Sequence, residues 1–259
     1  MSTLEAFILG IVQGLTEFLP ISSSGHLYLG RHLFNLDDAG LFLDTMLHVG
    51  TLIAVVVVYK QELIEIVRFP FRKRSLLLVV GTIPAVIVGL LFNDLFEAIS
   101  KTGVTIGWEF LLTGWILWLA DGVKNGKRKI NDISYGDALF IGTFQAAAIF
   151  PAISRSGLTI AAGLFRKLNR ETAAYFSFLL SIPAIAGGIV MQFMKMAEQN
   201  IEAVSFGSLL VATLSSAFFG YLAVVGMIEF LKKRSLKMFA VYVWILGSTI
   251  LLLQFTGVF

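Results

Sequence analysis

Long apolar runs separated by short polar segments dominate the chain. A helix that crosses a bilayer needs about 20 apolar residues. Strands of alternating polarity are absent, so the pattern predicts a helical bundle rather than a membrane β-barrel. Six runs are long enough to span a membrane, at about 41–59, 75–95, 105–121, 172–194, 205–231 and 238–256.

Two further apolar segments, 6–30 and 138–165, are each interrupted near the middle by a serine-rich break that contains proline. The breaks are FLPISSSGH (18–26) and FPAISRSGLT (150–159). Proline and glycine end or kink helices. Each flank has only about a dozen residues, which is too short to cross a bilayer. We therefore expect each segment to enter the membrane, turn and leave on the same side.

The loop charges indicate how these segments are oriented, because Lys and Arg concentrate in cytoplasmic loops. With the basic loops on the cytoplasmic side, segment 138–165 enters from the cytoplasm and segment 6–30 enters from outside. Each half of the chain then consists of one re-entrant segment followed by three membrane spans, and the two halves have opposite orientations in the membrane. The basic loops are 60–74, 124–129, 166–170 and 232–237, and the non-basic ones are 30–40, 93–103 and 195–204.

A weak internal repeat supports this topology. A shift of 132 residues aligns Gly10 with Gly142, Gln13 with Gln145, Ile21 with Ile153, Ser22 with Ser154, Ser24 with Ser156, and Gly25 with Gly157.

The predicted fold is therefore an all-α polytopic membrane protein. It has six transmembrane helices and two re-entrant helix-loop-helix segments in inverted-topology repeats. We expect one membrane domain, 1–259, with the first repeat at about 1–125 and the second at about 133–259. Ligand sites in such folds lie near the bilayer midplane, between the repeats.

Composition agrees with a membrane protein. The chain is 57% hydrophobic and 14% charged, with a mean hydropathy of +0.84, whereas soluble domains carry about 25% charged residues. There is no cysteine, which excludes disulfides and thiolate metal sites. The net charge of +3 is small and confined to loops, so nucleic-acid binding is not expected. The first 20 residues lack a basic n-region and contain Glu5 and Glu17, which is unlike a signal peptide.

The first break gathers polar groups that suit an anion. Gln13 and Glu17 share a helix face. The following helix is expected to begin near Ser24, where backbone N–H groups and the positive dipole end attract anions. Two simpler interpretations stay open: the serines cap a broken helix, or Glu17 faces a neighbouring helix. The polar residues at the turn are Ser22, Ser23, Ser24, Gly25 and His26.

The second break supplies Ser154, Arg155, Ser156 and Thr159. An arginine forms bidentate bonds to phosphate, and a helix start near Gly157 adds donors. The alternative is that Arg155 only pairs with Glu17. Together the two breaks predict a phosphate site.

Candidate cofactor and catalytic groups follow from residue chemistry. Glu17, with Gln13 as a neutral oxygen ligand, suggests a divalent cation, Mg²⁺ or Ca²⁺. His26 suits proton transfer near neutral pH, and Ser23 or Ser24 is a candidate nucleophile. Asp44 and His48 share a helix face and are candidates for a supporting pair, although helix packing is the favoured role. His32 is expected at the membrane interface.

The motifs also resemble a known family. GIVQGLTEFLPISSSGH (10–26) and FPAISRSGLT (150–159) are similar to the two motifs of bacterial undecaprenyl-diphosphatases, the bacitracin-resistance phosphatases. Gln13 stands at the first acidic position of that pattern, which puts a two-carboxylate metal site in doubt, and Ala152 replaces a usual glycine.

The resemblance implies hydrolysis of undecaprenyl diphosphate, with divalent-cation dependence and a site that opens to the outer face of the bacterial plasma membrane. It also implies that bacitracin competes for the same lipid and that the carrier is recycled for peptidoglycan synthesis. A homo-oligomer is possible. The implied catalytic residues are Glu17, Ser23, His26 and Arg155, and the implied substrate-binding residues are Ser22, Ser24, Gly25, Ser154, Ser156 and Thr159.

A second class of protein fits the topology. Inverted repeats with broken helices are typical of transporters, so a lipid or anion transporter or flippase is the alternative. The sequence leaves open whether Ser23, His26 or water attacks the phosphorus. It also leaves open the metal, the lipid chain length and whether flipping accompanies hydrolysis.

Overall fold

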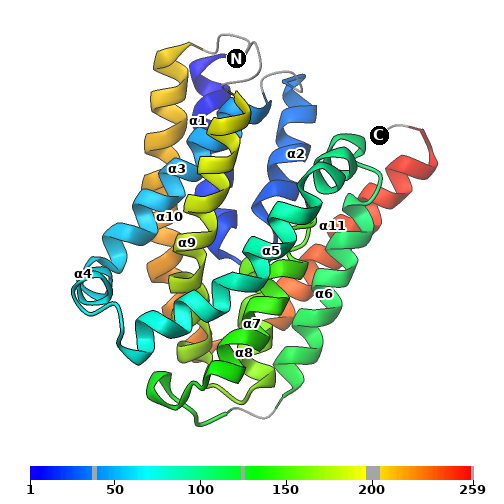
Figure 1. Ribbon diagram of the computed structural model, residues 1–259. Helices are drawn as coiled ribbons and strands as arrows, with labels where there is room; N and C mark the ends of the chain where they lie inside the picture. Colours follow the sequence, from blue (N-terminus) through cyan, green and yellow to red (C-terminus); the bar gives the residue numbers. More distant parts are fainter. Residues whose placement is uncertain (37–39, 124–125, 197–204, 258–259) are drawn as a thin grey trace.

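A computed structural model describes residues 1–36, 40–123, 126–196 and 205–257. Within these residues the chain forms helices and no strand (Figure 1). The α-helices are α1 (Thr3–Phe18), α2 (Ser23–Phe34), α3 (Gly40–Val58), α4 (Lys60–Arg68), α5 (Lys73–Thr102), α6 (Ile106–Gly122), α7 (Tyr135–Ala147), α8 (Arg155–Phe165), α9 (Arg170–Met196), α10 (Phe206–Lys233) and α11 (Lys237–Phe255), and η2 (Ile130–Asp132) is a 3₁₀ turn.

All six predicted spans are helical, which confirms the all-α membrane class. Four helices, α5, α9, α10 and α11, contain a stretch long and apolar enough to cross a bilayer by themselves. A fifth span results if α3 and α4 are counted together, although the pair is bent by 80°. The remaining predicted span, α6, has 17 residues and therefore rises about 26 Å.

Two segments predicted as loops are partly helical. The basic segment 60–74 contains α4, and the non-basic segment 93–103 continues α5 as far as Thr102. No proline or glycine interrupts the chain between Gly89 and Gly103, so nothing stops the helix earlier. The helix ends at Gly103, whose φ of +64° lies in the left-handed region that favours glycine.

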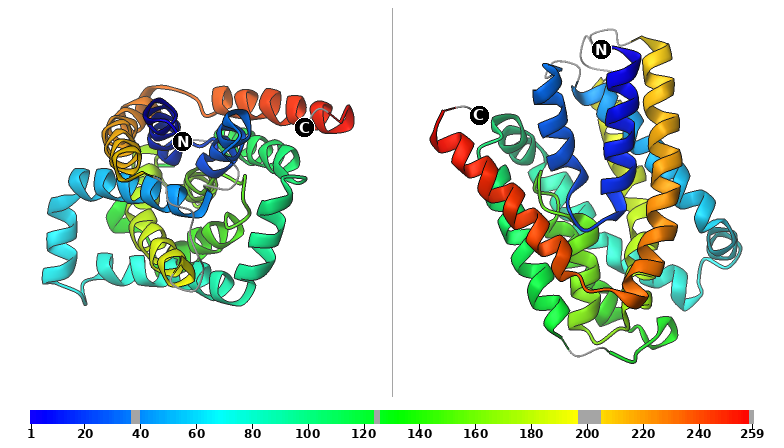
Figure 2. Two further views of the ribbon diagram at one scale, coloured as in Figure 1. Left: turned by 90° about the horizontal axis from the view of Figure 1, so that it is seen from above. Right: turned by 180° about the vertical axis from the view of Figure 1, so that it is seen from behind.

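Both re-entrant segments are confirmed as helix-break-helix arms. The chain descends in α1, turns over residues 19–22 and returns in α2; α7 and α8 do the same from the opposite end, turning over residues 148–154 (Figures 1 and 2). The two turns meet in the middle of the bundle. Residues 20–22 of the first break and 152–154 of the second are buried inside the protein, whereas Phe150 of the second break is 37% exposed.

Local geometry repeats at the offset of 132 residues. Ser22 caps α2 by accepting from the Gly25 N–H, and Ser154 caps α8 by accepting from the Gly157 N–H. The first helix of each arm packs on a long helix of the other half, α1 on α10 and α7 on α5. A Cβ at Gly10 would overlap Ser215 of α10. The equivalent Gly142 packs in the same manner on α5, so the matched glycines allow two equivalent close helix contacts.

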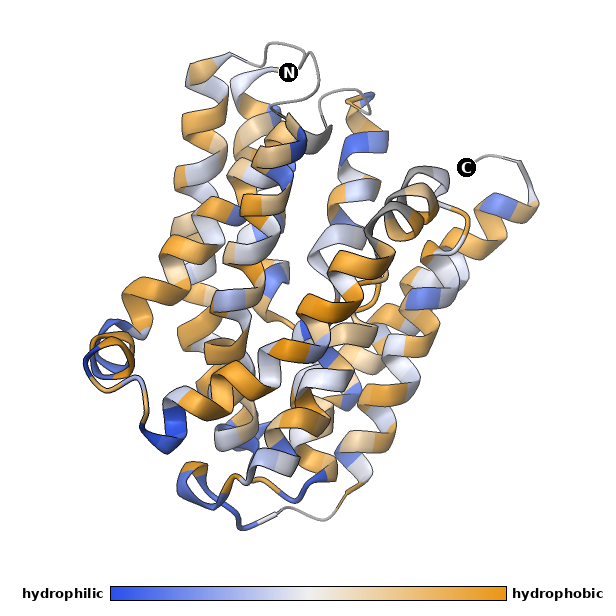
Figure 3. Cartoon of the chain, in the orientation of Figure 1, coloured by the Kyte–Doolittle hydropathy of each residue, from blue (hydrophilic) through white to orange (hydrophobic). Residues whose placement is uncertain are grey.

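Hydrophobic positions run along most of the helices, and hydrophilic positions gather in the loops at the lower end of the bundle (Figure 3). Large apolar side chains such as Leu90 and Ile245 are about two-thirds exposed, at 67% and 64%, as expected for lipid contact. The basic loops gather at one end of the bundle, which we call the basic end (lower in Figures 1 and 3).

At the basic end a buried carboxylate closes the α7–α8 arm. Asp137 of α7 accepts hydrogen bonds from Arg128 at 2.5 Å and from Arg166 Nε at 2.6 Å. Burial raises the pKa of Asp137, but hydrogen bonds from Arg128, Ser134 and Arg166 outweigh it and hold that pKa well below its usual range. The base of the arm is therefore fixed by a charged network, while its tip reaches the centre of the protein.

Candidate active site

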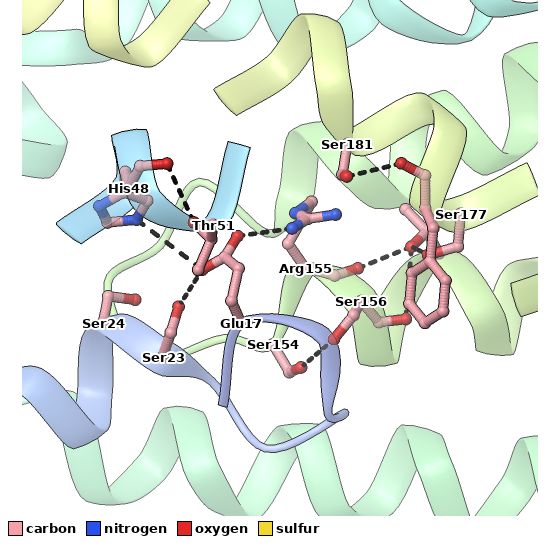
Figure 4. A network of polar contacts seen from close by, with 12 residues as sticks. Glu17, Ser23, Ser24, His48, Thr51, Ser154, Arg155, Ser156, Ser177 and Ser181 are labelled. Carbon is pink, nitrogen blue, oxygen red and sulfur yellow. Dashed lines mark hydrogen bonds and ion pairs between the residues drawn. The ribbon is translucent and has the colours of Figure 1, made fainter. Parts of the chain in front are cut away.

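An ion pair between the two arms forms the centre of the site. Glu17 lies in the last turn of α1, and Arg155 is the first residue of α8. Arg155 Nη2 donates to Glu17 Oε1 at 2.6 Å, and the two side chains are only 15% and 6% exposed (Figure 4). The pairing considered from the sequence is therefore present and direct, and it joins the two arms through residues that are 138 positions apart.

The same arginine has an unused donor. Arg155 Nη1 is buried and has no hydrogen-bond partner among the described residues. A buried N–H without an acceptor costs about 1–3 kcal/mol, and more when the group is charged. The site is therefore short of an acceptor, and a phosphate oxygen has the charge and the geometry to supply it.

The second oxygen of Glu17 gathers further polar groups. Ser23, the first residue of α2, donates its Oγ–H to Glu17 Oε2 at 2.5 Å. Gln13, one turn earlier in α1, donates its amide Nε2 to the same oxygen at 3.0 Å. The other amide atom, Gln13 Oε1, is buried without a partner among the described residues. A carboxylate, a hydroxyl and a free amide oxygen thus lie together beside the arginine.

His48 of α3 completes this cluster, and the sequence reasoning gave it little weight. Its Nε2 lies 3.8 Å from Glu17 Oε2 (Figure 4). Its Nδ1 donates to the backbone carbonyl of Asp44 at 2.7 Å. The hypothetical Asp44–His48 side-chain pair is wrong, because the Asp44 carboxylate binds Arg31 instead. The sequence signal that could have given His48 more weight is its position inside an apolar span, because ionisable residues there are usually functional.

His26 makes no hydrogen bond to the group formed by the other predicted catalytic residues, Glu17, Ser23 and Arg155, and its ring contacts other parts of the protein. Its Nδ1 contacts the Ser22 carbonyl oxygen at 2.6 Å, and its Nε2 contacts the Tyr242 hydroxyl at 2.8 Å. The ring stacks on Tyr242 and meets the edge of Phe110. Both ring nitrogens are thus engaged with groups other than Glu17 and Arg155. In this arrangement His26 fixes the first break against α6 and α11.

The predicted substrate-binding serines mostly hold the breaks in shape. Ser22 and Ser154 are the N-cap residues described above, and Ser22 adopts a positive φ of 70°. Such strain in a residue other than glycine is concentrated at functional sites. A Cβ at Gly25 would overlap the Phe110 ring, so this position needs glycine for packing.

Other hydroxyls tie the two breaks together or anchor α8. Ser24 donates to the Pro151 carbonyl in the second break. Ser156 donates to the Leu19 carbonyl in the first break at 2.9 Å. Thr159 donates to the Arg155 carbonyl at 2.8 Å, and its hydroxyl lies 2.6 Å from that of Ser177 in α9. These contacts fix the arms relative to each other, so that Arg155 reaches Glu17.

Two side chains of α6, which the sequence did not single out, hold the second break. Glu109, which is 6% exposed, accepts the backbone N–H of Ala152. One turn later, Thr113 Oγ1 accepts the backbone N–H of Ser154 at 3.2 Å. Glu109 Oε1 is buried and has no hydrogen-bond partner among the described residues. The α6 face therefore presents two acceptors to the break that ends at Arg155. Nothing local in the sequence links Glu109 to that break.

Fold and site together define a polytopic helical membrane protein with a buried Glu17–Arg155 ion pair where two re-entrant arms meet. Comparison with known proteins makes this specific. Residues 6–249 match the family described as bacitracin resistance protein BacA, and the chain belongs to that family.

Relatives align over the whole chain. It is 68% identical over 259 residues to undecaprenyl-diphosphatase 3 of Bacillus cereus, with 100% of both chains covered. It is 46% identical to the undecaprenyl-diphosphatase of Carboxydothermus hydrogenoformans and 38% identical to that of Halothermothrix orenii, again with 100% of each chain covered.

Proposed function

We propose that this chain is an integral membrane phosphatase that hydrolyses undecaprenyl diphosphate to undecaprenyl phosphate and inorganic phosphate. This reaction recycles the lipid carrier for peptidoglycan synthesis and gives resistance to bacitracin, which competes for the same lipid. One observation carries the proposal: Arg155, which pairs with the same Glu17 carboxylate that accepts from Ser23, has a buried N–H with no partner among the described residues. The transporter alternative finds no support among the relatives, whose names are those of hydrolases.

The geometry suggests how the chain's own residues act. Arg155 and the N-terminus of α8 hold oxygens of the terminal phosphate and stabilise the charge that develops on them. Ser23 Oγ attacks the terminal phosphorus, and the bond from that phosphorus to the bridging oxygen breaks. Undecaprenyl phosphate leaves with the electron pair, and the Ser23 proton passes to Glu17 Oε2, 2.5 Å away.

Water completes the reaction. A water molecule attacks the phosphorus of the phosphoserine, and the bond from that phosphorus to Ser23 Oγ breaks. Glu17 returns its proton to Ser23 Oγ, and both protons of the water leave with inorganic phosphate as H₂PO₄⁻. Proton transfer through His26, the other candidate, would first require the ring to release Ser22 or Tyr242. Glu17 already contacts the Ser23 hydroxyl, and we therefore favour it as the proton acceptor.

The donor set fits a cation that arrives with the diphosphate. Among the described residues no cluster of three His, Cys, Asp or Glu side chains is present to hold a metal alone. Mg²⁺, however, is commonly held by one or two carboxylates plus substrate phosphates. Glu17 and the unpartnered Gln13 Oε1 would hold Mg²⁺ or Ca²⁺. Such an ion would neutralise charge on the diphosphate.

The location follows from the loop charges. We place the chain in the bacterial plasma membrane with the basic end in the cytoplasm. The α1–α2 arm then opens to the outer side, where it would admit the diphosphate headgroup. Labelling of single cysteines introduced at Ser2 and Lys127 in intact cells would test this orientation, since only Ser2 should react with an impermeant reagent.

The activity is tested with purified protein. In detergent, the protein should release phosphate from undecaprenyl diphosphate, and a chelator should lower the rate at least tenfold until Mg²⁺ or Ca²⁺ is restored. Cation binding is measured separately by calorimetry with a non-hydrolysable diphosphate, and Glu17→Gln should weaken it. Movement of the lipid across vesicles without phosphate release would favour the transporter. Full hydrolysis in the presence of chelator would contradict the cation requirement but would leave the proposed phosphatase activity standing.

Glu109 is expected to act by positioning Arg155. Glu109→Leu removes the acceptor for the Ala152 N–H and should lower kcat/KM roughly 10- to 100-fold, because small misplacements of catalytic groups are costly. The Glu109→Gln variant keeps a side-chain acceptor for this N–H and should therefore retain most of the wild-type activity. In the Arg155→Ala background, Glu109→Leu should add little further loss. Additive losses in that double variant would instead indicate a purely structural role.

A further inference from the structure

A second cavity lies at the basic end, away from the Glu17–Arg155 site. Its volume is about 380 Å³, and it is bounded by α4, the start of α5, the turn at 130–131 and the start of α9. Its inner wall is apolar and includes Ile66, Leu77, Phe176 and Leu179. This volume lies in the range of small-molecule pockets, about 300–1,000 Å³.

The rim of this basic-end cavity is polar and predominantly cationic. Arg72, Lys73 and Arg74 line it, together with Glu62 and Glu65. The two carboxylates do not neutralise all three cations. Glu65 lies 2.7 Å from Arg72 and 4.0 Å from Arg74, but among the described residues no carboxylate pairs with Lys73.

The cationic rim is also structurally braced. Lys73 Nζ donates to the Asn131 carbonyl at 3.0 Å, and Arg74 Nη2 donates to the Asn131 side-chain oxygen at 3.3 Å. These bonds connect the α4–α5 corner to the turn before α7. The three cations surround the N-terminus of the 30-residue helix α5, whose N-cap residue, Arg72, makes no side-chain capping bond. The positive dipole end of this helix adds to their field.

The neighbouring helix indicates that the cavity lies at the membrane surface. Helix α4 is bent by 80° from α3, which directs it along the membrane plane rather than through it (Figure 2). Its apolar side chains Ile64 and Val67 are 65% and 79% exposed, and Phe71 after it is 87% exposed. A helix with exposed apolar side chains among charged ones is typical of the boundary between headgroups and acyl chains.

We propose that this basic-end cavity binds an anionic phospholipid from the leaflet at the basic end. The phosphate lies at Arg72, Lys73 and Arg74, and the upper part of an acyl chain lies along the apolar wall. The charge of the rim selects an anionic headgroup, and the apolar wall selects a lipid over a free anion. This site is independent of the proposed hydrolysis, because none of its residues belongs to the Glu17–Arg155 cluster.

The test compares lipids retained by purified protein, using native mass spectrometry after exchange into vesicle lipids of defined composition. The wild-type protein should retain phosphatidylglycerol at least fivefold more than phosphatidylcholine. The triple variant Arg72→Gln, Lys73→Gln, Arg74→Gln should lose this preference. The control is Lys232→Gln, Lys233→Gln, Arg234→Gln, which removes the same charge at the same end but away from the cavity, and it should keep the preference.

A second variant separates site binding from general surface charge. Ile66→Trp fills the apolar part of the cavity without changing the rim, and it should lower phosphatidylglycerol retention at least threefold. Inorganic phosphate at millimolar concentration should not displace the lipid. The proposal is overturned if both charge variants lose the lipid equally, if Ile66→Trp has no effect, or if phosphate competes. Helical content by circular dichroism confirms that each variant is folded.

Discussion

Arg155→Ala is expected to lower kcat/KM for undecaprenyl diphosphate by about 10³-fold. The change removes the Nη1 donor, which has no partner among the described residues, as well as the charge that would stabilise the transition state. A single oxyanion-type donor contributes about 10²–10³ in rate. Phosphate release at saturating and subsaturating substrate measures the loss.

The control for this prediction must address stability. Removal of Arg155 leaves the Glu17 carboxylate buried and unpaired, and breaking a buried pair destabilises proteins by about 3–5 kcal/mol. Arg155→Lys keeps the charge but loses the fork of the guanidinium, and it should lose activity roughly 10²-fold while its thermal unfolding changes less. Full activity of Arg155→Ala at both substrate concentrations would remove the arginine from the mechanism.

Ser23→Ala is expected to lower kcat by about 10³-fold with little change in KM, because the attacking oxygen is lost while Arg155 still holds the phosphate. Ser24 is the matched control. It is the next residue in the chain, but its hydroxyl donates to the Pro151 carbonyl rather than to Glu17. Ser24→Ala should therefore stay within about tenfold of wild-type activity, since it loses one exposed hydrogen bond of about 0.5–1.5 kcal/mol.

Trapping the intermediate distinguishes the three candidates for the nucleophile. With substrate labelled in the terminal phosphate and rapid acid quenching, the label should be found on Ser23 by peptide mapping. A label on His26 would make the histidine the nucleophile. An active Ser23→Ala variant with no labelled protein would indicate direct attack by water.

The helical spans and the two breaks could be predicted from the sequence because their causes are local. An apolar run of sufficient length must form a helix in lipid, where every backbone group needs an internal partner. In each arm, a break with proline and serine follows the first helix, and a serine of that break caps the second helix. Glu17, Ser23 and Arg155 were singled out as candidates for a related reason: polar groups in an apolar segment are expensive and rarely accidental.

Contacts between distant segments could not be predicted in this way. Nothing near Glu109 in the sequence indicates that it accepts the Ala152 N–H, and His48 gives no local sign that it faces Glu17. The histidine of the first motif, His26, turned out to contact Tyr242 of α11. Each of these contacts depends on how helices pack across the bundle, which many distributed apolar contacts decide.

The sequence by itself thus determined the class of the protein, the two arms and the residue types at their tips. Only the tertiary structure decided that Glu17 and Arg155 meet directly and which hydroxyl lies against the carboxylate. It also decided that one guanidinium N–H finds no acceptor in the part of the chain that the structure describes. The physical reason is the range of the forces involved. Hydropathy and capping act within a few turns of chain, whereas an ion pair between residues 138 positions apart exists only after both arms are packed.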